Sequence, residues 1–98
     1  MVKHIILWKL KEEYTNNVEI KNGMKRNLES LLGKIDGLLE INVQIDKLPS
    51  SNADVMLYAL FENEDALKGY SSHREHVWIA ENSVRPFTKT RMCFDFEV

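Results

Sequence analysis

The sequence predicts an α+β domain in which a four-stranded antiparallel sheet carries helices on one face. Four segments alternate apolar and polar residues with the period of a strand, and two stretches between them show helical spacing, in the order β-α-β-β-α-β. The first and third strand segments are apolar on both faces, whereas the second and fourth are apolar mainly on one. Strands apolar on both faces are expected at the centre of the sheet, as in ferredoxin-like folds.

The first strand is expected over residues 2–11, where both faces carry large apolar side chains. One face holds Val2, His4, Ile6, Trp8 and Leu10. A histidine on such an apolar face is more often a hydrogen-bonded core residue than a ligand.

A helix is predicted after the polar connection of residues 12–17. Asn16 is its expected N-cap, with Glu19 three residues later in capping-box spacing. Its apolar stripe follows helical spacing and is made of Met24, Leu28, Leu31, Leu32 and Ile35. The sequence Asp36-Gly37 then predicts a turn.

The next two strands differ in the number of their apolar faces. The second has one, made of Leu39, Ile41, Val43 and Ile45. A loop is expected at residues 48–52, and the third strand follows with two apolar faces: Val55, Leu57, Ala59 and Phe61 on one, and Met56, Tyr58 and Leu60 on the other. Helices cover only one side of such a sheet. We therefore expect a homodimer that buries the remaining apolar side, sheet against sheet.

Two helical pieces are expected after the third strand. The first covers residues 64–70, and Asn63 is its N-cap. Ser72 and Glu75 have the spacing of a capping box, so the second piece is predicted to begin at His73.

The chain closes with a turn and a fourth strand. Residues 84–87 are expected to form the turn, because the residue before a proline avoids helical backbone. The drier face of the strand is made of Thr90, Met92, Phe94, Phe96 and Val98. Cys93 is the only cysteine, which excludes an internal disulfide and suits a reducing compartment such as the cytoplasm. We interpret it as a small apolar strand residue and not as a catalytic thiol.

Length and charge limit the classes of partner. The 98 residues make one domain, taken as residues 1–98. The net charge of -2 gives no electrostatic basis for binding nucleic acid. No apolar run approaches the roughly 18 residues of a membrane helix, and no basic-then-apolar leader is recognisable. A cytoplasmic protein without nucleic-acid or membrane partners is expected.

The stretch from Lys68 to Ala80 is where chemistry is most expected. His73 and His76 are three residues apart and can share a helix face, and Tyr70 stands just upstream. Three interpretations remain open. The histidines are structural; or histidine and tyrosine act as general base and acid; or His4 joins the two histidines in a metal site. His-x-x-His alone is a weak metal signal, so no metal is predicted.

Five segments together resemble the stress-responsive A/B barrel (Dabb) family over nearly the whole chain. They are residues 2–4, residues 61–67 leading into Tyr70, residues 73–77, residues 84–86 and residues 94–96. The resemblance implies a ferredoxin-like protomer, a dimer whose two sheets form an α/β barrel, and a cavity between sheet and helices.

A plant member of this family is a cyclase of a linear polyketide, and its catalytic tyrosine and histidine correspond to Tyr70 and His76 here. The resemblance implies a cofactor-free lyase or cyclase, in which His76 removes a proton next to a carbonyl that Tyr70 polarises. The residues expected around the substrate are His4, Ile6, Trp8, Trp78 and Ile79. The chain departs from the family at Arg74, where proline is usual, and so loses a rigid helix start.

Two other functions stay open. One is a stress-associated homodimer that binds a small molecule or serves a structural role; it predicts a filled interior and an unperturbed His76. The other is an oxygenase of the related dimeric barrel superfamily, which includes haem-degrading members. No residue spacing supports haem, so no cofactor is predicted.

Overall fold

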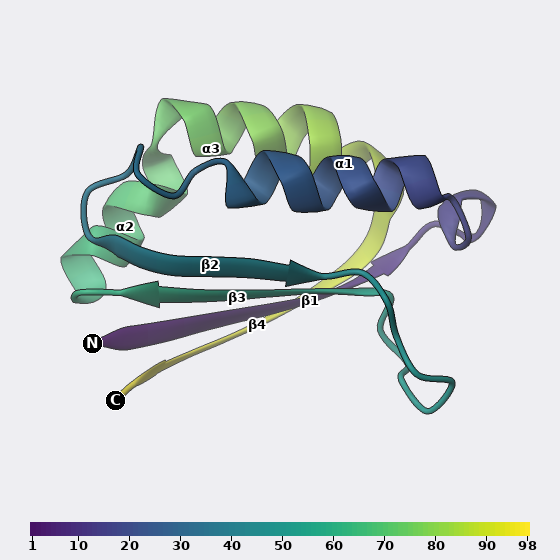
Figure 1. Cartoon of the computed structure of the whole chain (residues 1–98), viewed down its shortest axis with the longest axis horizontal. Coiled ribbons are helices and arrows are strands. Elements are labelled where there is room, and N and C mark those ends of the chain that lie inside the picture. Colours follow the sequence, from purple (N-terminus) through teal and green to yellow (C-terminus); the bar gives the residue numbers. More distant parts are fainter.

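One four-stranded antiparallel sheet with helices on a single face forms the structure (Figure 1). The computed structural model describes residues 1–98. Its main elements are β1 (Val2–Leu10), α1 (Val18–Glu29), β2 (Leu38–Gln44), β3 (Val55–Phe61), α2 (Glu64–Ser72), α3 (Arg74–Ile79) and β4 (Thr88–Glu97). The strand order β2-β3-β1-β4 places the first and third strands at the centre, which confirms the predicted ferredoxin-like arrangement.

The helix-covered face of the sheet holds the core. All five residues predicted for one face of β1 are buried: Val2, His4, Ile6, Trp8 and Leu10. Their partners on β3 are also buried, such as Ala59 opposite His4 and Leu57 opposite Ile6. The two-faced apolar pattern of β1 and β3 therefore reflects their central position.

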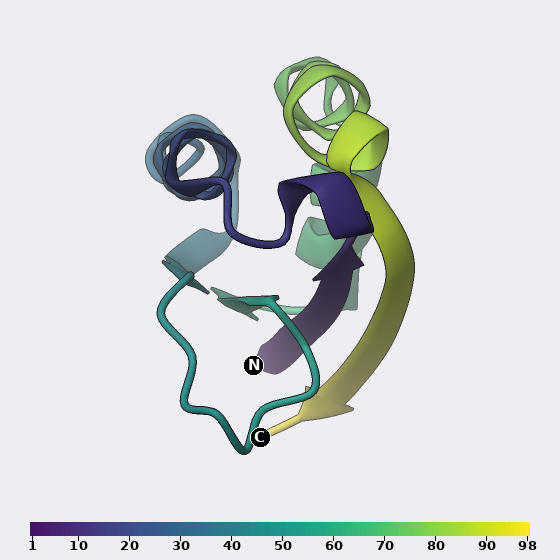
Figure 2. The ribbon, with the colours of Figure 1, turned by 90° about the vertical axis from the view of Figure 1, so that its right-hand side faces the viewer.

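The other side of the sheet carries no helix (Figure 2). We call it the open face and define it by Ile5, Leu7, Met56, Tyr58, Leu60, Met92, Phe94 and Phe96, which the strand registers bring to one side. Met92 and Phe94 are 71% and 68% exposed. A continuous apolar surface of this kind is typical of a protein interface, as the sequence pattern predicted.

The structure corrects two details of the first half of the chain. The N-cap of α1 is Asn17 and not Asn16, since the Asn17 side chain accepts a hydrogen bond from the backbone N–H of Ile20 at 3.0 Å. The helix ends at Glu29, earlier than the apolar stripe predicted. Met24, Leu28, Leu31 and Ile35 of the stripe are buried as expected, whereas Leu32 is 50% exposed.

The β2 strand also differs from the prediction at its start. Its register against β3 shifts between Leu38 and Glu40, as in a β-bulge. The extra residue turns Leu38 inward and leaves Leu39 42% exposed, although Leu39 was predicted for the apolar face. Past the irregularity, Ile41 and Val43 are buried as expected.

The break between α2 and α3 is built differently from the predicted capping box. Ser72 belongs to the last turn of α2, where its hydroxyl donates to the Lys68 carbonyl at 3.2 Å. His73 is the N-cap instead: its backbone is extended, and its Nδ1 accepts from the Glu75 N–H at 3.1 Å. The α3 helix therefore begins at Arg74.

The segment after α3 is helical for longer than the proline predicted. A π-helical turn at Ala80–Val84 runs into a short 3-10 helix at Arg85–Phe87. Arg85 keeps helical dihedrals, with φ -57° and ψ -40°, in spite of Pro86 behind it. The expected simple turn is therefore wrong.

No helix of the fold combines the length and apolar character that a membrane crossing requires.

Replacing Gly37 by alanine is expected to destabilise the fold more than the same change at Gly33. Both glycines have positive φ, +81° at Gly37 and +88° at Gly33, which costs an alanine roughly 1–2 kcal/mol. Only at Gly37 would the new Cβ meet another atom, the Ala66 Cβ of α2 at 2.5 Å. Overpacking adds about 1–3 kcal/mol. Urea unfolding of the two variants measures the difference, and equal stabilities would contradict it.

Candidate functional site

A cavity of about 530 Å³ lies between the helix-covered face of the sheet and the segments that follow β3. Strand β1 contributes His4, Ile6 and Trp8, the end of α2 contributes Tyr70, and α3 contributes His76. Five residues of the predicted site therefore line one cavity. Its size is within the range of small-molecule sites.

Tyr70 and His76 lie against each other across the break between α2 and α3. Their ring centroids are 4.2 Å apart, with an interplanar angle of 39°. Tyr70 is only 2% exposed and packs edge-on against Phe61 at 5.1 Å and His4 at 6.0 Å. The tyrosine ring is thus fixed by packing against two neighbouring rings.

The Tyr70 hydroxyl is prepared to donate a hydrogen bond. Burial raises the pKa of Tyr70 well above its usual value, and the nearby Arg91 offsets only part of that rise. The phenol therefore keeps its proton at neutral pH. The Tyr70 hydroxyl makes no hydrogen bond within the chain. Every fully enclosed side-chain oxygen of the structure has a hydrogen-bond partner, so the Tyr70 oxygen is not fully enclosed. The hydroxyl consequently reaches the cavity.

His76 is arranged as a base. Its Nδ1 lies 3.3 Å from the Ser71 carbonyl oxygen, which only accepts, so Nδ1 carries the proton and Nε2 keeps a lone pair. Burial lowers the pKa of His76, and the positive charges of Arg85 and Arg91 act in the same direction. The imidazole is therefore neutral at pH 7.

The pKa shift of His76 predicts a pH-dependent stability. The folded chain binds fewer protons than the unfolded chain between the lowered pKa and about 6.5, so this contribution is fully present above pH 6.5. It is lost as the pH falls through the folded pKa. Imidazole NMR titration should place His76 below 6.5, and urea unfolding of His76→Gln should show a weaker loss of stability on acidification. A midpoint at or above 6.5 would contradict the burial argument.

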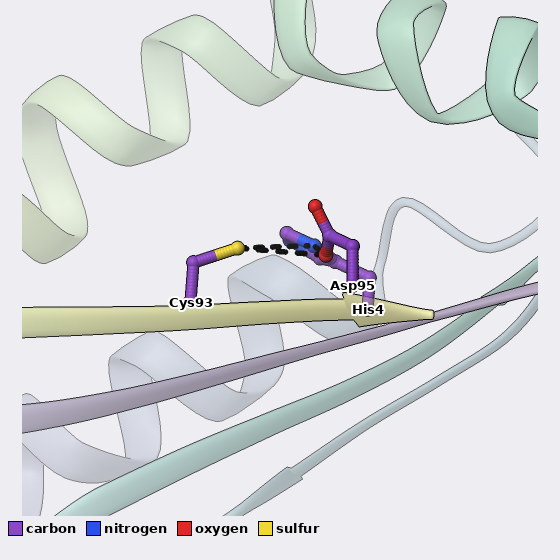
Figure 3. Close-up of side chains that lie close together, drawn as sticks. All are labelled: His4, Cys93 and Asp95. Atoms are coloured by element: carbon purple, nitrogen blue, oxygen red, sulfur yellow. Dashed lines mark hydrogen bonds and ion pairs between the residues drawn. The ribbon is translucent and has the colours of Figure 1, made fainter. Parts of the chain in front are cut away.

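His4 is held by a partner that the sequence analysis missed. His4 is 6% exposed, and its Nδ1 lies 2.5 Å from Asp95 Oδ1 (Figure 3). The carboxylate accepts a hydrogen bond from the Nδ1–H group, so Nε2 is the ring nitrogen that is not bound to Asp95. Asp95 lies directly opposite His4 in the β1–β4 register. Only the pairing of the first and last strands brings these residues together, and no local pattern signals it.

The lining of the cavity is positively charged. Arg85, Lys89 and Arg91 are among the lining residues, which include no aspartate or glutamate. Arg85 has a single distant ion pair, with Glu81 at 3.9 Å on the surface. The cavity is therefore suited to a ligand with a negative charge, a feature that the sequence analysis did not predict.

Two residues expected at the substrate are placed elsewhere. His76 and Ala80 line the cavity from one side of the helical segment, so Trp78 between them points away and is 60% exposed. Ile79 is buried but does not line the cavity, and both residues border a separate surface hollow. His73 is also outside the cavity, so the structure does not assemble the metal trio considered from the sequence.

Comparison with known proteins agrees with this architecture. A stress-response A/B barrel domain-containing protein from Arabidopsis thaliana is 28% identical over 98 residues. The match covers 98% of this chain and 36% of that protein, so the chain spans about a third of its relative.

Solved structures show the same fold. A dimeric protein of unknown function with a ferredoxin-like fold from Bacteroides fragilis is 33% identical and has a TM-score of 0.87, covering 99% of this chain and 95% of that chain. Its dimeric state supports the predicted homodimer. The hydroxynitrile lyase from Passiflora edulis has a TM-score of 0.82 at 11% identity, covers 99% of this chain and 92% of that one, and shares the fold alone. The model of the stress responsive A/B barrel domain matches residues 2–98, and the chain therefore belongs to this family.

Proposed function

We propose that this protein is a cofactor-independent enzyme that makes or breaks a carbon–carbon bond beside a carbonyl group, as a lyase or cyclase. The observation that carries the proposal is the pairing of a free phenol with a neutral imidazole in one cavity. The ring centroids of Tyr70 and His76 are 4.2 Å apart, and both residues line the cavity. Such a pair supplies a general acid and a general base without a metal or an organic cofactor.

The proposed chemistry assigns the proton transfers to His76 and a hydrogen bond to Tyr70. Nε2 of His76 removes a proton from the carbon next to a carbonyl, and the Tyr70 hydroxyl donates a hydrogen bond to the carbonyl oxygen as it becomes an enolate. The enolate carbon then attacks a second carbonyl of the same substrate. His76 returns its proton to the new alkoxide, which leaves the enzyme unchanged. The lyase reaction is the reverse sequence.

The charges of the cavity support a substrate that is an anionic carbonyl compound. Arg85, Lys89 and Arg91 line the cavity, and no lining residue carries a carboxylate. They attract a substrate carboxylate and also stabilise the negative charge that develops on the enolate. His4, held by Asp95 through Nδ1, leaves Nε2 as the ring nitrogen that a polar group of the substrate can contact.

Two further observations favour an enzyme over a structural dimer. A dimer without a ligand site predicts a filled interior and an unperturbed His76. The cavity of about 530 Å³ and the lowered pKa of His76 argue against both expectations. The hydroxynitrile lyase of the same fold supports the idea that this scaffold accommodates a lyase site.

The free thiol of Cys93 suits the reducing cytoplasm.

Deuterium exchange tests the proton transfer at the α-carbon, the step that the lyase and cyclase reactions share. The test needs no knowledge of the natural substrate. The purified protein is incubated in D₂O with levulinate, a ketone that carries a carboxylate, or with 2-pentanone, its neutral counterpart. Loss of the α-proton signals is followed by NMR. We expect the protein to accelerate exchange, and more strongly for levulinate. Exchange at the buffer rate for both ketones would remove the enzymatic proposal.

A further inference from the structure

A cluster of three chemically different donors lies next to the cavity. Strands β1 and β4 are paired so that His4 is opposite Asp95, and Cys93 lies two residues before Asp95 on the same side of β4. Figure 3 shows Cys93 and Asp95 rising from that side, with the His4 ring between and behind them. The Cys93 sulfur is 3.8 Å from His4 Nδ1 and 3.4 Å from Asp95 Oδ1. Three ligand-type atoms therefore surround one point.

The arrangement differs from a nucleophilic relay. In a cysteine–histidine–aspartate relay, the thiol and the carboxylate address opposite nitrogens of the imidazole. Here both are closest to Nδ1. A thiol and a carboxylate that approach the same imidazole nitrogen are instead arranged as ligands of one cation would be.

We propose that His4, Cys93 and Asp95 form a binding site for a divalent transition metal of the zinc class. Donor atoms around a tetrahedral zinc ion are about 3.3–3.7 Å apart, given the usual zinc–ligand distances. The two separations to the sulfur, 3.4 Å and 3.8 Å, are close to this range without any movement. The Nδ1–Oδ1 pair at 2.5 Å must open by rotation of the exposed Asp95 carboxylate when the metal replaces the proton between them.

The donor set selects the kind of metal. Thiolate and imidazole are poor ligands for magnesium and calcium, and together with one carboxylate they suit zinc, cobalt or nickel. Access is open, because Cys93 is exposed and the Asp95 side chain is 40% exposed. With three protein ligands, a fourth position remains for water or a small ligand, which is the pattern of a catalytic or regulatory site rather than a closed structural one.

Metal binding would replace the hydrogen bond between His4 and Asp95 by two metal–ligand bonds. Without metal, Nδ1 donates to Asp95. With the metal on Nδ1, the neutral ring carries its proton on Nε2. The ring lies 6.0 Å from the Tyr70 ring, so this change takes place beside the proposed acid–base pair. The metal site goes beyond the proposed function and does not depend on it.

Cobalt titration tests the site without any substrate. The reduced, chelator-treated protein is titrated with CoCl₂ and followed by absorption spectroscopy. We expect one Co²⁺ per chain, a thiolate-to-cobalt charge-transfer band in the near ultraviolet, and visible bands of tetrahedral intensity. Cys93→Ser should abolish the charge-transfer band. Asp95→Asn should weaken binding by about tenfold or more, the loss that even an outer partner of a metal ligand causes.

Glu97→Gln provides the matched control. Glu97 is the next residue on the same side of β4, opposite Val2, and lies outside the cluster, so cobalt affinity should be unchanged. His4 is buried, and if His4→Gln fails to fold, the exposed Asp95 and Cys93 still decide the question. Absence of the charge-transfer band, unchanged affinity in Asp95→Asn, or one Co²⁺ per two chains would each overturn the proposal.

Discussion

Tyr70→Phe and His76→Gln are each expected to lower the catalysed exchange rate by a factor of about 10²–10⁴, the usual contribution of a positioned acid or base. The phenylalanine keeps the ring that packs between His4 and Phe61 and removes only the hydroxyl. The glutamine retains a polar side chain of similar reach but lacks a basic nitrogen. The rate is measured with levulinate in D₂O, and circular dichroism and thermal unfolding report whether the fold is retained.

Tyr14→Phe is the control for the tyrosine variant. Tyr14 also packs edge-on against a phenylalanine, Phe87 at 5.2 Å, but lies outside the cavity. Its hydroxyl should be dispensable for exchange. If both site variants kept the wild-type rate while folded, the acid–base assignment would be wrong, and a binding or structural homodimer would be the better description.

Phe94→Asp is expected to convert the homodimer into a monomer. Phe94 is 68% exposed on the open face, opposite Ile5 of the central strand β1, and its ring lies 5.8 Å from that of Phe96. A carboxylate buried there without a partner costs several kcal/mol, so the dimer dissociation constant should rise by about 10²-fold or more. Light scattering coupled to size-exclusion chromatography at micromolar concentration measures the change in mass.

Leu48→Asp is the matched change outside the open face. Leu48 is 73% exposed in the loop between β2 and β3, so it tests the effect of an added charge at an exposed leucine. This variant should remain dimeric. A dimeric Phe94→Asp protein, or a wild-type chain that is monomeric at the same concentration, would show that the open face is not the interface.

The strands and their order were predictable because burial determines the residue pattern directly. A strand covered on both faces must be apolar at every position, and β1 and β3 come closest to this pattern. Helix ends were less predictable, since neighbouring residues compete for one cap. Asn16 and Asn17 have the same side chain, and the helix uses the second as its cap. At the α2–α3 break, an imidazole caps where a serine was expected.

The candidate site was predictable only in part, for a related reason. His4, Tyr70 and His76 were identified from their residue types and their family resemblance, and they line one cavity. Trp78 was expected in the cavity but lies outside it, because the phase of a short helix depends on where it begins. Asp95 was missed because its partner lies 91 positions away, and strand pairing rather than local spacing brings them together.

The extended residue between α2 and α3 controls how the candidate acid and base are placed relative to each other. His73 has φ -63° and ψ 133°, and it separates the helix that bears the phenol from the helix that bears the imidazole. The distance between the Tyr70 and His76 side chains therefore depends on the backbone dihedrals of this one residue. A change in those dihedrals would alter that distance without altering the sheet or its open face.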